Sequence, residues 1–172
     1  VMDFIKKEIV KGRQVYIVYP LIEESATLDY ENLMKGFEEV KSFFPEPKYW
    51  ISMVHGRQKG DQKQTNMQRF VTGDTQIMVS TTVIEVGVNV PNASVMVIES
   101  AEKFGLSQLH QLRGRVGRGS EKSFCILLTG NKISQDGRER LKILCATNDG
   151  FKVAEKDLEI RGPGDMEGTR QS

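Results

Sequence analysis

Short runs of β-branched and aromatic residues alternate along this chain with segments of helical spacing, and this alternation constrains the fold most strongly. Strands separated by helices pair in parallel, through right-handed crossover connections. Near-continuous apolar runs indicate strands that are covered on both faces of their sheet. We expect five such strands, at Val15–Tyr19, Tyr49–Val54, Gln76–Ser80, Ser94–Glu99 and Ser123–Leu128.

The segments between these runs carry apolar residues three and four positions apart, the spacing of one helix face. Leu28–Phe44 and Gly60–Val71 are the expected crossover helices, and Phe4–Val10 is expected to form a lead-in helix. We therefore predict an α/β domain over residues 1–130, in which a parallel sheet is flanked by helices. The apolar positions at this spacing are Leu33, Met34, Phe37, Val40 and Phe44 in the first helix, and Met67, Phe70 and Val71 form a narrow apolar edge of the second.

Residues 131–172 have a different pattern, which predicts a helical hairpin followed by a loop. Arg138–Cys145 is expected to be helical, with Leu141, Leu144 and Cys145 on one side. Asn148-Asp149-Gly150 is a turn signal, and a second helix is expected near Lys152–Glu159. The Gly- and Pro-rich sequence after Ile160 would end that helix.

Composition excludes several classes of protein. Charged residues make up 27% of the chain but the net charge is only +1, which does not favour a simple basic DNA-binding module. No apolar run approaches the roughly 20 residues of a membrane span, and the first residues lack the pattern of a signal peptide. Cys125 and Cys145 show no C-x-x-C spacing, which favours reduced cysteines in a cytoplasmic protein. His55 and His110 have no partners at metal-ligand spacing, so no metal site is predicted.

The phosphate-binding loop of a nucleotide hydrolase is absent from this sequence. Neither Gly-Lys-Ser nor Gly-Lys-Thr occurs in it, and no Asp-Glu pair follows an apolar strand. We therefore expect no ATP hydrolysis by this chain alone, and any such chemistry would need a partner lobe.

Three arginines occur within six residues in Gln111-Leu112-Arg113-Gly114-Arg115-Val116-Gly117-Arg118. A guanidinium is a planar fork of donors that matches a phosphate and stays charged at working pH. Glycines beside it allow the backbone a close approach. This composition is typical of an arginine finger, which stabilises charge on a transferred phosphoryl group.

Gln111–Arg118 resembles the sixth motif of superfamily 2 helicases, Ser80–Pro91 resembles their fifth motif, and His55-Gly56-Arg57 their fourth. The resemblance implies a RecA-like lobe that meets ATP and Mg²⁺ held mainly by an absent first lobe. Gln111, Arg115 and Arg118 would be the catalytic residues.

The same resemblance supplies further contacts. Gly87 and Asn89 would contact the nucleotide, although the family usually has aspartate at the position of Asn89. Gly56, Arg57, Thr81 and Thr82 would hold DNA phosphates without reading base sequence. His55 is interpreted either as a hydrogen-bonded surface histidine or as a direct DNA contact.

The C-terminal segment Asp157–Asp165, followed by Gly168–Ser172, resembles the translocation motif that RecG-type helicases share with the transcription-repair coupling factor. The sequences Arg-Gly-Pro-Gly and Gly-Thr-Arg-Gln-Ser within this segment favour the RecG type. By this resemblance Arg140, Arg161, Arg170 and Gln171 would couple nucleotide state to movement on DNA. Arg161 and Arg170 have an alternative interpretation as ordinary surface charges.

The sequence thus resembles the second motor lobe of a RecG-type, ATP-dependent DNA helicase that remodels branched DNA in recombination and repair. The resemblance implies as partners branched or duplex DNA and the first lobe and wedge domain of the same protein, in the bacterial cytoplasm at the nucleoid. Two alternatives stay open: a lobe of a transcription-repair coupling translocase, and a non-catalytic module that binds DNA or protein.

Overall fold

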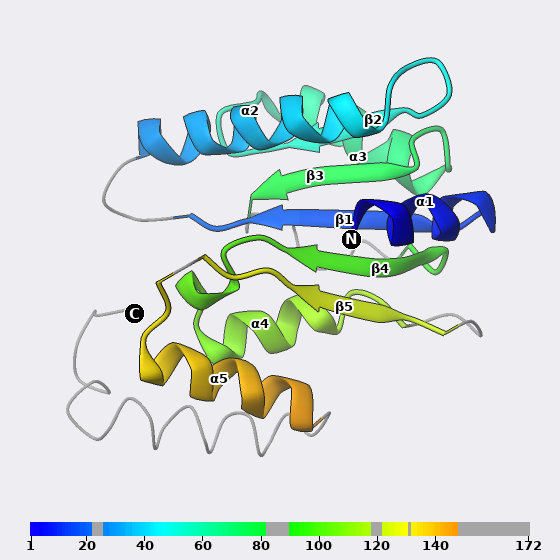
Figure 1. Ribbon diagram of the computed structural model, residues 1–172. Helices are drawn as coiled ribbons and strands as arrows, with labels where there is room; N and C mark the ends of the chain where they lie inside the picture. The colour runs from blue at the N-terminus through cyan, green and yellow to red at the C-terminus, as the bar shows by residue number, and fades with distance from the viewer. Residues whose placement is uncertain (22–25, 82–89, 118–121, 131, 148–172) are drawn as a thin grey trace.

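The computed structural model describes residues 1–21, 26–81, 90–117, 122–130 and 132–147. Within these ranges five parallel strands form one sheet in the order β2-β3-β1-β4-β5 (Figure 1). The strands are β1 (Gln14–Tyr19), β2 (Ile51–Val54), β3 (Ile77–Thr81), β4 (Ala93–Ile98) and β5 (Phe124–Leu127). The predicted parallel sheet is confirmed, and the strand ends move by no more than two residues.

Five helices are described. They are α1 (Met2–Val10), α2 (Ala26–Phe43), α3 (Gly60–Val71), α4 (Leu106–Arg113) and α5 (Gln135–Ala146), with a 3-10 turn, η1 (Ala101–Lys103), before α4. Of these, α1, α2, α3 and α5 overlap helices predicted from the apolar spacing. The prediction for α3 is confirmed at both ends. Helix α5 begins three residues before the predicted Arg138, because Ser134 caps it: its Oγ accepts a hydrogen bond of 3.0 Å from the Gly137 N–H. The second hairpin helix, predicted near Lys152–Glu159, lies outside the described residues.

Side chains of the strands alternate between two separate apolar clusters, one on each face of the sheet. Ile77 and Val79 of β3 join a cluster with residues of α1 and α2, whereas Met78 joins a cluster with residues of α3, α4 and α5. The sheet is therefore covered on both faces, which is why its strands read as continuous apolar runs. Figure 1 shows α2 over β2 and β3, and α4 with α5 beside β5.

Two residues of the expected apolar helix sides are exposed. Val71 is 39% exposed because it is the last residue of α3, and Cys145 is exposed near the end of α5. Leu144, the neighbour of Cys145, is the residue of that helix which is fully buried against the sheet. Phe70 at 0% exposure serves the same purpose for α3.

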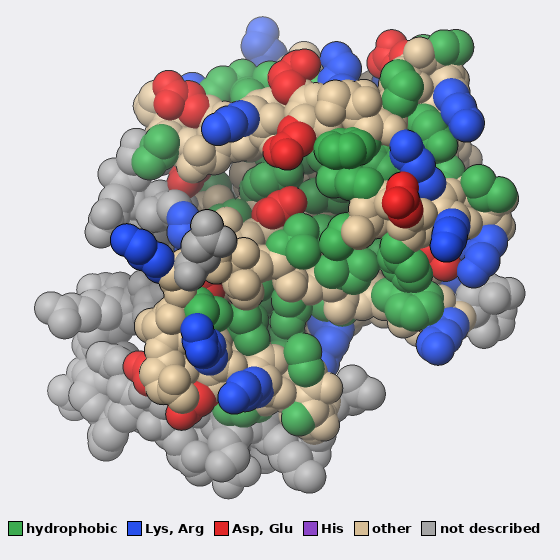
Figure 2. Space-filling model, in the orientation of Figure 1, with side chains coloured by type: hydrophobic (Ala, Val, Ile, Leu, Met, Phe, Trp, Pro, Cys, Tyr) green, Lys and Arg blue, Asp and Glu red, His purple; other side chains and the backbone are tan. Residues whose placement is uncertain are grey.

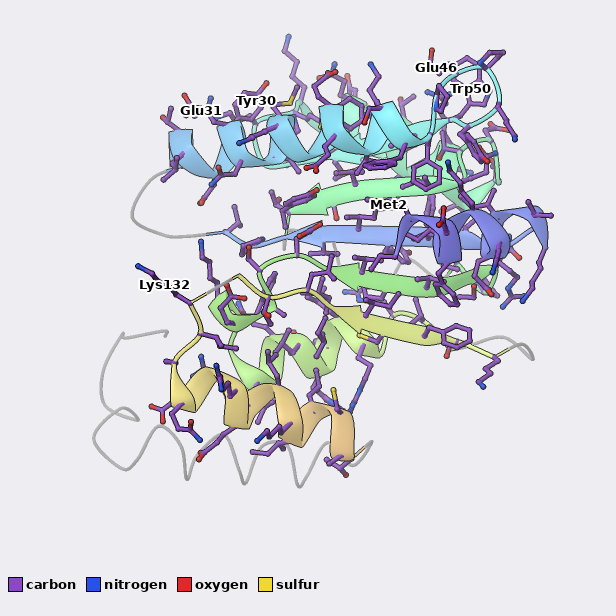
Figure 3. All side chains as sticks on the ribbon, viewed as in Figure 1. Met2, Tyr30, Glu31, Glu46, Trp50 and Lys132 are labelled. Carbon is purple, nitrogen blue, oxygen red and sulfur yellow. The ribbon has the colours of Figure 1, made fainter. Side chains whose placement is uncertain are left out.

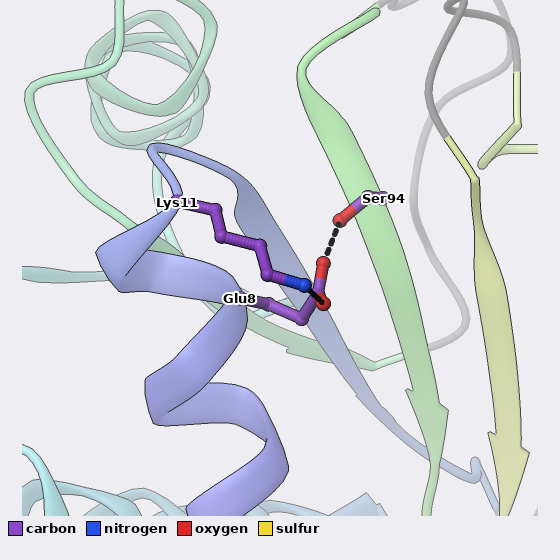
Figure 4. Close-up of polar contacts among 3 residues, drawn as sticks. All are labelled: Glu8, Lys11 and Ser94. Carbon is purple, nitrogen blue, oxygen red and sulfur yellow. Dashed lines mark hydrogen bonds and ion pairs between the residues drawn. The ribbon is translucent and has the colours of Figure 1, made fainter.

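Polar contacts attach α1 to the middle of the sheet (Figure 4). The buried carboxylate of Glu8 accepts hydrogen bonds from Lys11 Nζ at 3.2 Å and from Ser94 Oγ of β4 at 3.3 Å. Gln14, buried at the start of β1, donates to the carbonyls of Phe70 and Thr75 at 2.6 and 2.9 Å. The lead-in helix is therefore part of the folded domain. None of the described helices has the length and apolar character needed to cross a membrane.

Candidate DNA and nucleotide interfaces

The carboxyl ends of β2 and β3 bring three of the predicted DNA-binding residues together. Val54 pairs with Ser80 across the two strands, so the loop that begins at His55 lies beside Thr81. A cavity of about 390 Å³ opens at this edge. Its walls include Gly56, Arg57 and Thr81, together with His55, Leu21 after β1 and residues of the first half of α2. Thr82, the fourth predicted residue, lies outside the described residues.

His55 is the buried first residue of this loop. It is 8% exposed, and its Nδ1 accepts a hydrogen bond of 3.2 Å from the backbone N–H of Arg57. The neutral ring therefore carries its proton on Nε2. Burial lowers the pKa of His55 below its usual value, and the positive charges of Lys63 and Arg57 lower it further. His55 is hydrogen-bonded as expected, but it is buried and does not lie on the surface.

Thr81 lines the same cavity. Its side chain is 3% exposed, and within the described part of the chain its hydroxyl and that of Ser80 are buried without a hydrogen-bond partner. A buried hydroxyl left unpaired costs about 1–3 kcal/mol. Both hydroxyls are enclosed at the carboxyl end of β3, so a ligand would reach them only after the neighbouring chain moves.

Helix α4 presents the first part of the arginine motif. Leu106, Leu109 and Leu112 are buried against the sheet, which leaves Gln111 exposed on the opposite side. After Arg113 the turn continues through a hydrogen bond of 3.0 Å from the Arg115 N–H to the Leu112 carbonyl. Arg115 is half-buried on this turn. Arg118, Gly87 and Asn89 lie outside the described residues.

Gly117 ends this turn with a conformation that only glycine adopts easily. Its φ is +86°, and a Cβ at this position would lie 2.6 Å from Ser123 Oγ. Val116, which directly precedes Gly117, is 9% exposed and packs in the apolar cluster beneath α4. The glycine spacing in the motif therefore has a backbone reason at this position.

Arg113 has a structural contact that sequence reasoning missed. Its guanidinium hydrogen-bonds the carbonyl of Leu144 through Nη1, and Nη2 lies 3.1 Å from His110 Nδ1. The first arginine of the motif thus ties α4 to the end of α5. Only the spacing of three arginines was visible in the sequence, and it could not separate this arginine from the other two. A cavity of about 600 Å³ lies beside the contact and is lined in part by Cys125 and Cys145.

Arg140, predicted to couple nucleotide state to movement, is buried at 8% exposure between α5 and η1. Its Nη2 donates to the Glu102 carbonyl at 3.2 Å, and the Glu102 carboxylate accepts from the Gly130 N–H at 3.1 Å. Arg140 therefore joins α5 to the turn that precedes α4. Arg161, Arg170 and Gln171 lie outside the described residues.

The described site residues form two clusters. Gly56, Arg57 and Thr81 lie at the carboxyl ends of β2 and β3, whereas Gln111 and Arg115 lie at the far end of α4, beside β5 (Figure 1). An amide and a guanidinium are hydrogen-bond donors that suit phosphate oxygens. Within the described ranges no group of three His, Cys, Asp or Glu side chains gathers as a metal site would require.

Charges are interspersed on the surface. Figure 2 shows Lys and Arg side chains mixed with Asp and Glu over the visible face, in keeping with the net charge of +1. The overall charge therefore gives no reason to expect strong binding to a polyanion.

Two family descriptions match the chain: "Helicase conserved C-terminal domain" over residues 1–120, and "ATP-dependent DNA helicase RecG, domain 3, C-terminal" over residues 147–172. Among curated relatives, the ATP-dependent DNA helicase RecG of Bacillus subtilis is 52% identical over 172 residues, which cover 100% of this chain and 25% of the relative. RecG of Escherichia coli K12 is 52% identical over 164 residues, covering 95% of this chain and 23% of the relative. The chain thus spans about a quarter of the length of these relatives.

Solved structures support the same grouping. A RecG bound to a three-way DNA junction superposes with a TM-score of 0.79 at 42% identity, covering 96% of this chain and 21% of that one. The C-terminal domain of Saccharomyces cerevisiae Dbp5 superposes with a TM-score of 0.54 at 15% identity, covering 92% of this chain and 90% of that one, which shows the fold alone. The predicted RecA-like fold and the resemblance to RecG-type helicases are confirmed.

Proposed function

The chain belongs to the helicase conserved C-terminal domain family, and from this premise we propose that it is the second motor lobe of a RecG-type, ATP-dependent DNA helicase. The observation that carries the proposal is 52% identity to a RecG along the whole chain, which spans only a quarter of that relative. The whole protein would then contain a first motor lobe and a wedge domain. In this proposal residues 1–130 are the lobe and residues 131–172 are the helical hairpin and translocation motif.

We propose that the nucleotide interface consists of Gln111, Arg115 and Arg118, with Gly87 and Asn89 beside the nucleotide. ATP with Mg²⁺ would be held mainly by the first lobe, and its hydrolysis would supply the free energy for movement on DNA. The described part fits this role because Gln111 is exposed and Arg115 stands on a turn fixed by Leu112 and Val116. An arginine finger contributes on the order of 10³–10⁵ in turnover.

The DNA interface in this proposal is the carboxyl edge formed by Gly56, Arg57, Thr81 and Thr82. Arg57 is exposed and charged, and Thr81 lines the same cavity. These groups suit phosphate oxygens and carry no pattern for reading bases. The lobe would therefore follow the DNA backbone without sequence preference.

Coupling between the two interfaces is assigned to Arg140, Arg161, Arg170 and Gln171. Arg140 supports this role because it joins α5 to η1, directly before the helix that carries Gln111. Arg113 adds a second connection from that helix to α5. A change in the position of Arg115 would thus reach α5 through contiguous contacts.

A branched DNA substrate is proposed because the RecG of the matching structure is bound to a three-way DNA junction. An enzyme that remodels stalled forks in recombination and repair would act in the bacterial cytoplasm, at the nucleoid. The test is ATP-dependent unwinding of a three-way junction by the full-length protein, compared with a linear duplex of equal length.

Together with an assay of RNA polymerase displacement, this test separates the three candidate functions. Unwinding of the junction in preference to the linear duplex supports the RecG type. ATP-dependent displacement of a stalled RNA polymerase without junction unwinding would select the coupling translocase. DNA binding with neither activity would overturn the motor assignment in favour of a binding module.

A further inference from the structure

Three side chains from two separate segments, α2 and the loop after β2, meet beside the cavity at the carboxyl edge of the sheet. The guanidinium carbon of Arg57 lies 4.5 Å from the centroid of the Tyr30 ring. The ring centroids of Tyr30 and His55 are 5.2 Å apart, at an interplanar angle of 65°. Figure 3 shows Tyr30 on the part of α2 nearest the carboxyl ends of the strands. Tyr30, His55 and Arg57 thus form one contact group, the Tyr30 cluster.

Two contacts restrain the Arg57 side chain, and a third restrains its backbone. The ring of Tyr30 attracts the guanidinium by a cation–π contact. Nη2 of Arg57 donates to Thr27 Oγ1 at 3.3 Å, and its backbone N–H donates to His55 Nδ1 at 3.2 Å. Arg57 is nevertheless exposed. An exposed arginine usually samples many rotamers, so these contacts restrict one that would otherwise move freely.

The ring contact leaves the donors of Arg57 available. A guanidinium carries five N–H groups, and a cation–π contact uses its charge without using any of them as a hydrogen-bond donor. Within the described residues, the hydrogen bond to Thr27 engages Nη2 only. Arg57 therefore has donors left for a two-pronged contact with a phosphate.

Tyr30 itself has no other polar task that the described contacts reveal. It is half-buried, it comes from α2 and not from the loop after β2, and it is the only described ring that touches both His55 and Arg57. The ring therefore contacts the loop after β2 from the neighbouring helix α2. Its position relative to Arg57 is therefore better explained by orientation of the guanidinium than by core burial.

We propose that Tyr30 is a positioning residue of the DNA interface, whose ring holds the Arg57 guanidinium in place to bind a backbone phosphate of duplex DNA. This inference rests on the proposed function, in which Arg57 contacts DNA. Preorganisation reduces the entropy that Arg57 loses on binding, so the benefit appears as affinity without any contact between Tyr30 and DNA.

The test measures binding of the full-length protein to a fluorescent three-way junction by anisotropy, over a series of salt concentrations. The variants are Tyr30→Leu, which fills the space without a π face, Tyr30→Phe, which keeps the ring, and Arg57→Ala. Lys41→Ala removes a second cation–π pair of α2, in which Nζ lies 5.4 Å from the Phe37 ring, and serves as the matched control.

Tyr30→Leu is expected to weaken binding about two- to fivefold, the effect of one exposed cation–π contact, while Tyr30→Phe and Lys41→Ala bind as the wild type does. Arg57→Ala should lower the slope of log K against log salt by about 0.9, the value for one phosphate. Tyr30→Leu should cause no further loss in the Arg57→Ala background.

Two failures are distinguishable. If Arg57→Ala leaves both affinity and salt slope unchanged, the proposed DNA interface at this edge is wrong, and the role of Tyr30 with it. If Arg57→Ala behaves as expected but Tyr30→Leu is silent, or weakens binding equally with and without Arg57, the positioning role alone is overturned.

Discussion

Replacing Gly36 with alanine is expected to destabilise the domain, although alanine is the better helix former. Gly36 is buried in the middle of α2. A Cβ added there would lie 2.3 Å from Tyr19 Oη, 2.4 Å from Cζ and 2.6 Å from Cε1. Tyr19 ends β1 and its ring is rigid, so relief requires movement of the whole side chain or of α2.

The magnitude follows from two opposing effects. Alanine favours a helix interior over glycine by about 0.8–1.0 kcal/mol. Overpacking of a well-filled site costs about 1–3 kcal/mol, and contacts this short correspond to the upper half of that range. The net loss in the free energy of unfolding is therefore about 1–2 kcal/mol. With a urea dependence of about 2 kcal/mol per molar, the midpoint of urea unfolding should fall by about 0.5–1 M.

Two controls isolate the contact. In a Tyr19→Ala background, Gly36→Ala should raise stability by about 1 kcal/mol, because only the helix preference remains. Gly60→Ala at the start of α3, where a Cβ meets nothing within 4 Å, should not lower the midpoint. If Gly36→Ala stabilises the protein equally with and without Tyr19, the packing of α2 on the end of β1 is wrong.

Two further predictions use the titratable groups. Folding lowers the pKa of His55, mainly through burial and also through Lys63 and Arg57, so the unfolded chain takes up that proton first as pH falls. The neutral ring therefore contributes fully to the free energy of unfolding above about pH 6.5, and this contribution falls as pH drops below that value. Measured by urea unfolding, the stability of His55→Gln should fall less steeply with acid than that of the wild type. An equally steep fall in both proteins would contradict this. Burial raises the pKa of the Cys125 thiol to about 11, although the positive charge of Arg113 partly offsets this rise. Cys145, in contrast, is exposed. Iodoacetamide at neutral pH should therefore alkylate Cys145 first by peptide mass spectrometry, and earlier labelling of Cys125 would refute the burial argument.

The fold could be predicted from the sequence because its signals are local. The β-branched side chains of Val15–Tyr19 and Gln76–Ser80 themselves indicate strands. The apolar edge of Gly60–Val71 and the glycine that ends this helix, Gly73, also lie within one short segment. The position of β1 between β3 and β4 is not a local property, because it depends on which crossovers each helix makes. The early start of α5 was missed because the cap at Ser134 precedes the apolar pattern.

The candidate site divides in the same way. Gly56, Arg57 and Thr81 were singled out by motif, and their common edge follows from the parallel strands that precede them. The partners of Arg57 and Arg113 were not predictable, because Tyr30 and Leu144 lie 27 and 31 residues away along the chain. Such contacts depend on the packing of α2 and α5. The roles of the site residues stay predictions until they are tested by mutation.

The central claim is that this lobe completes an ATP site with its arginines, and the most direct measurement is DNA-stimulated ATP hydrolysis by the full-length protein. Arg118→Ala is compared with the wild type and with Arg69→Ala, which removes an exposed arginine of α3. The account predicts a fall in turnover on the order of 10³-fold for Arg118→Ala, with junction binding retained, and normal turnover for Arg69→Ala. Equal hydrolysis by wild type and Arg118→Ala would contradict it and leave a lobe that binds DNA or protein without a catalytic arginine.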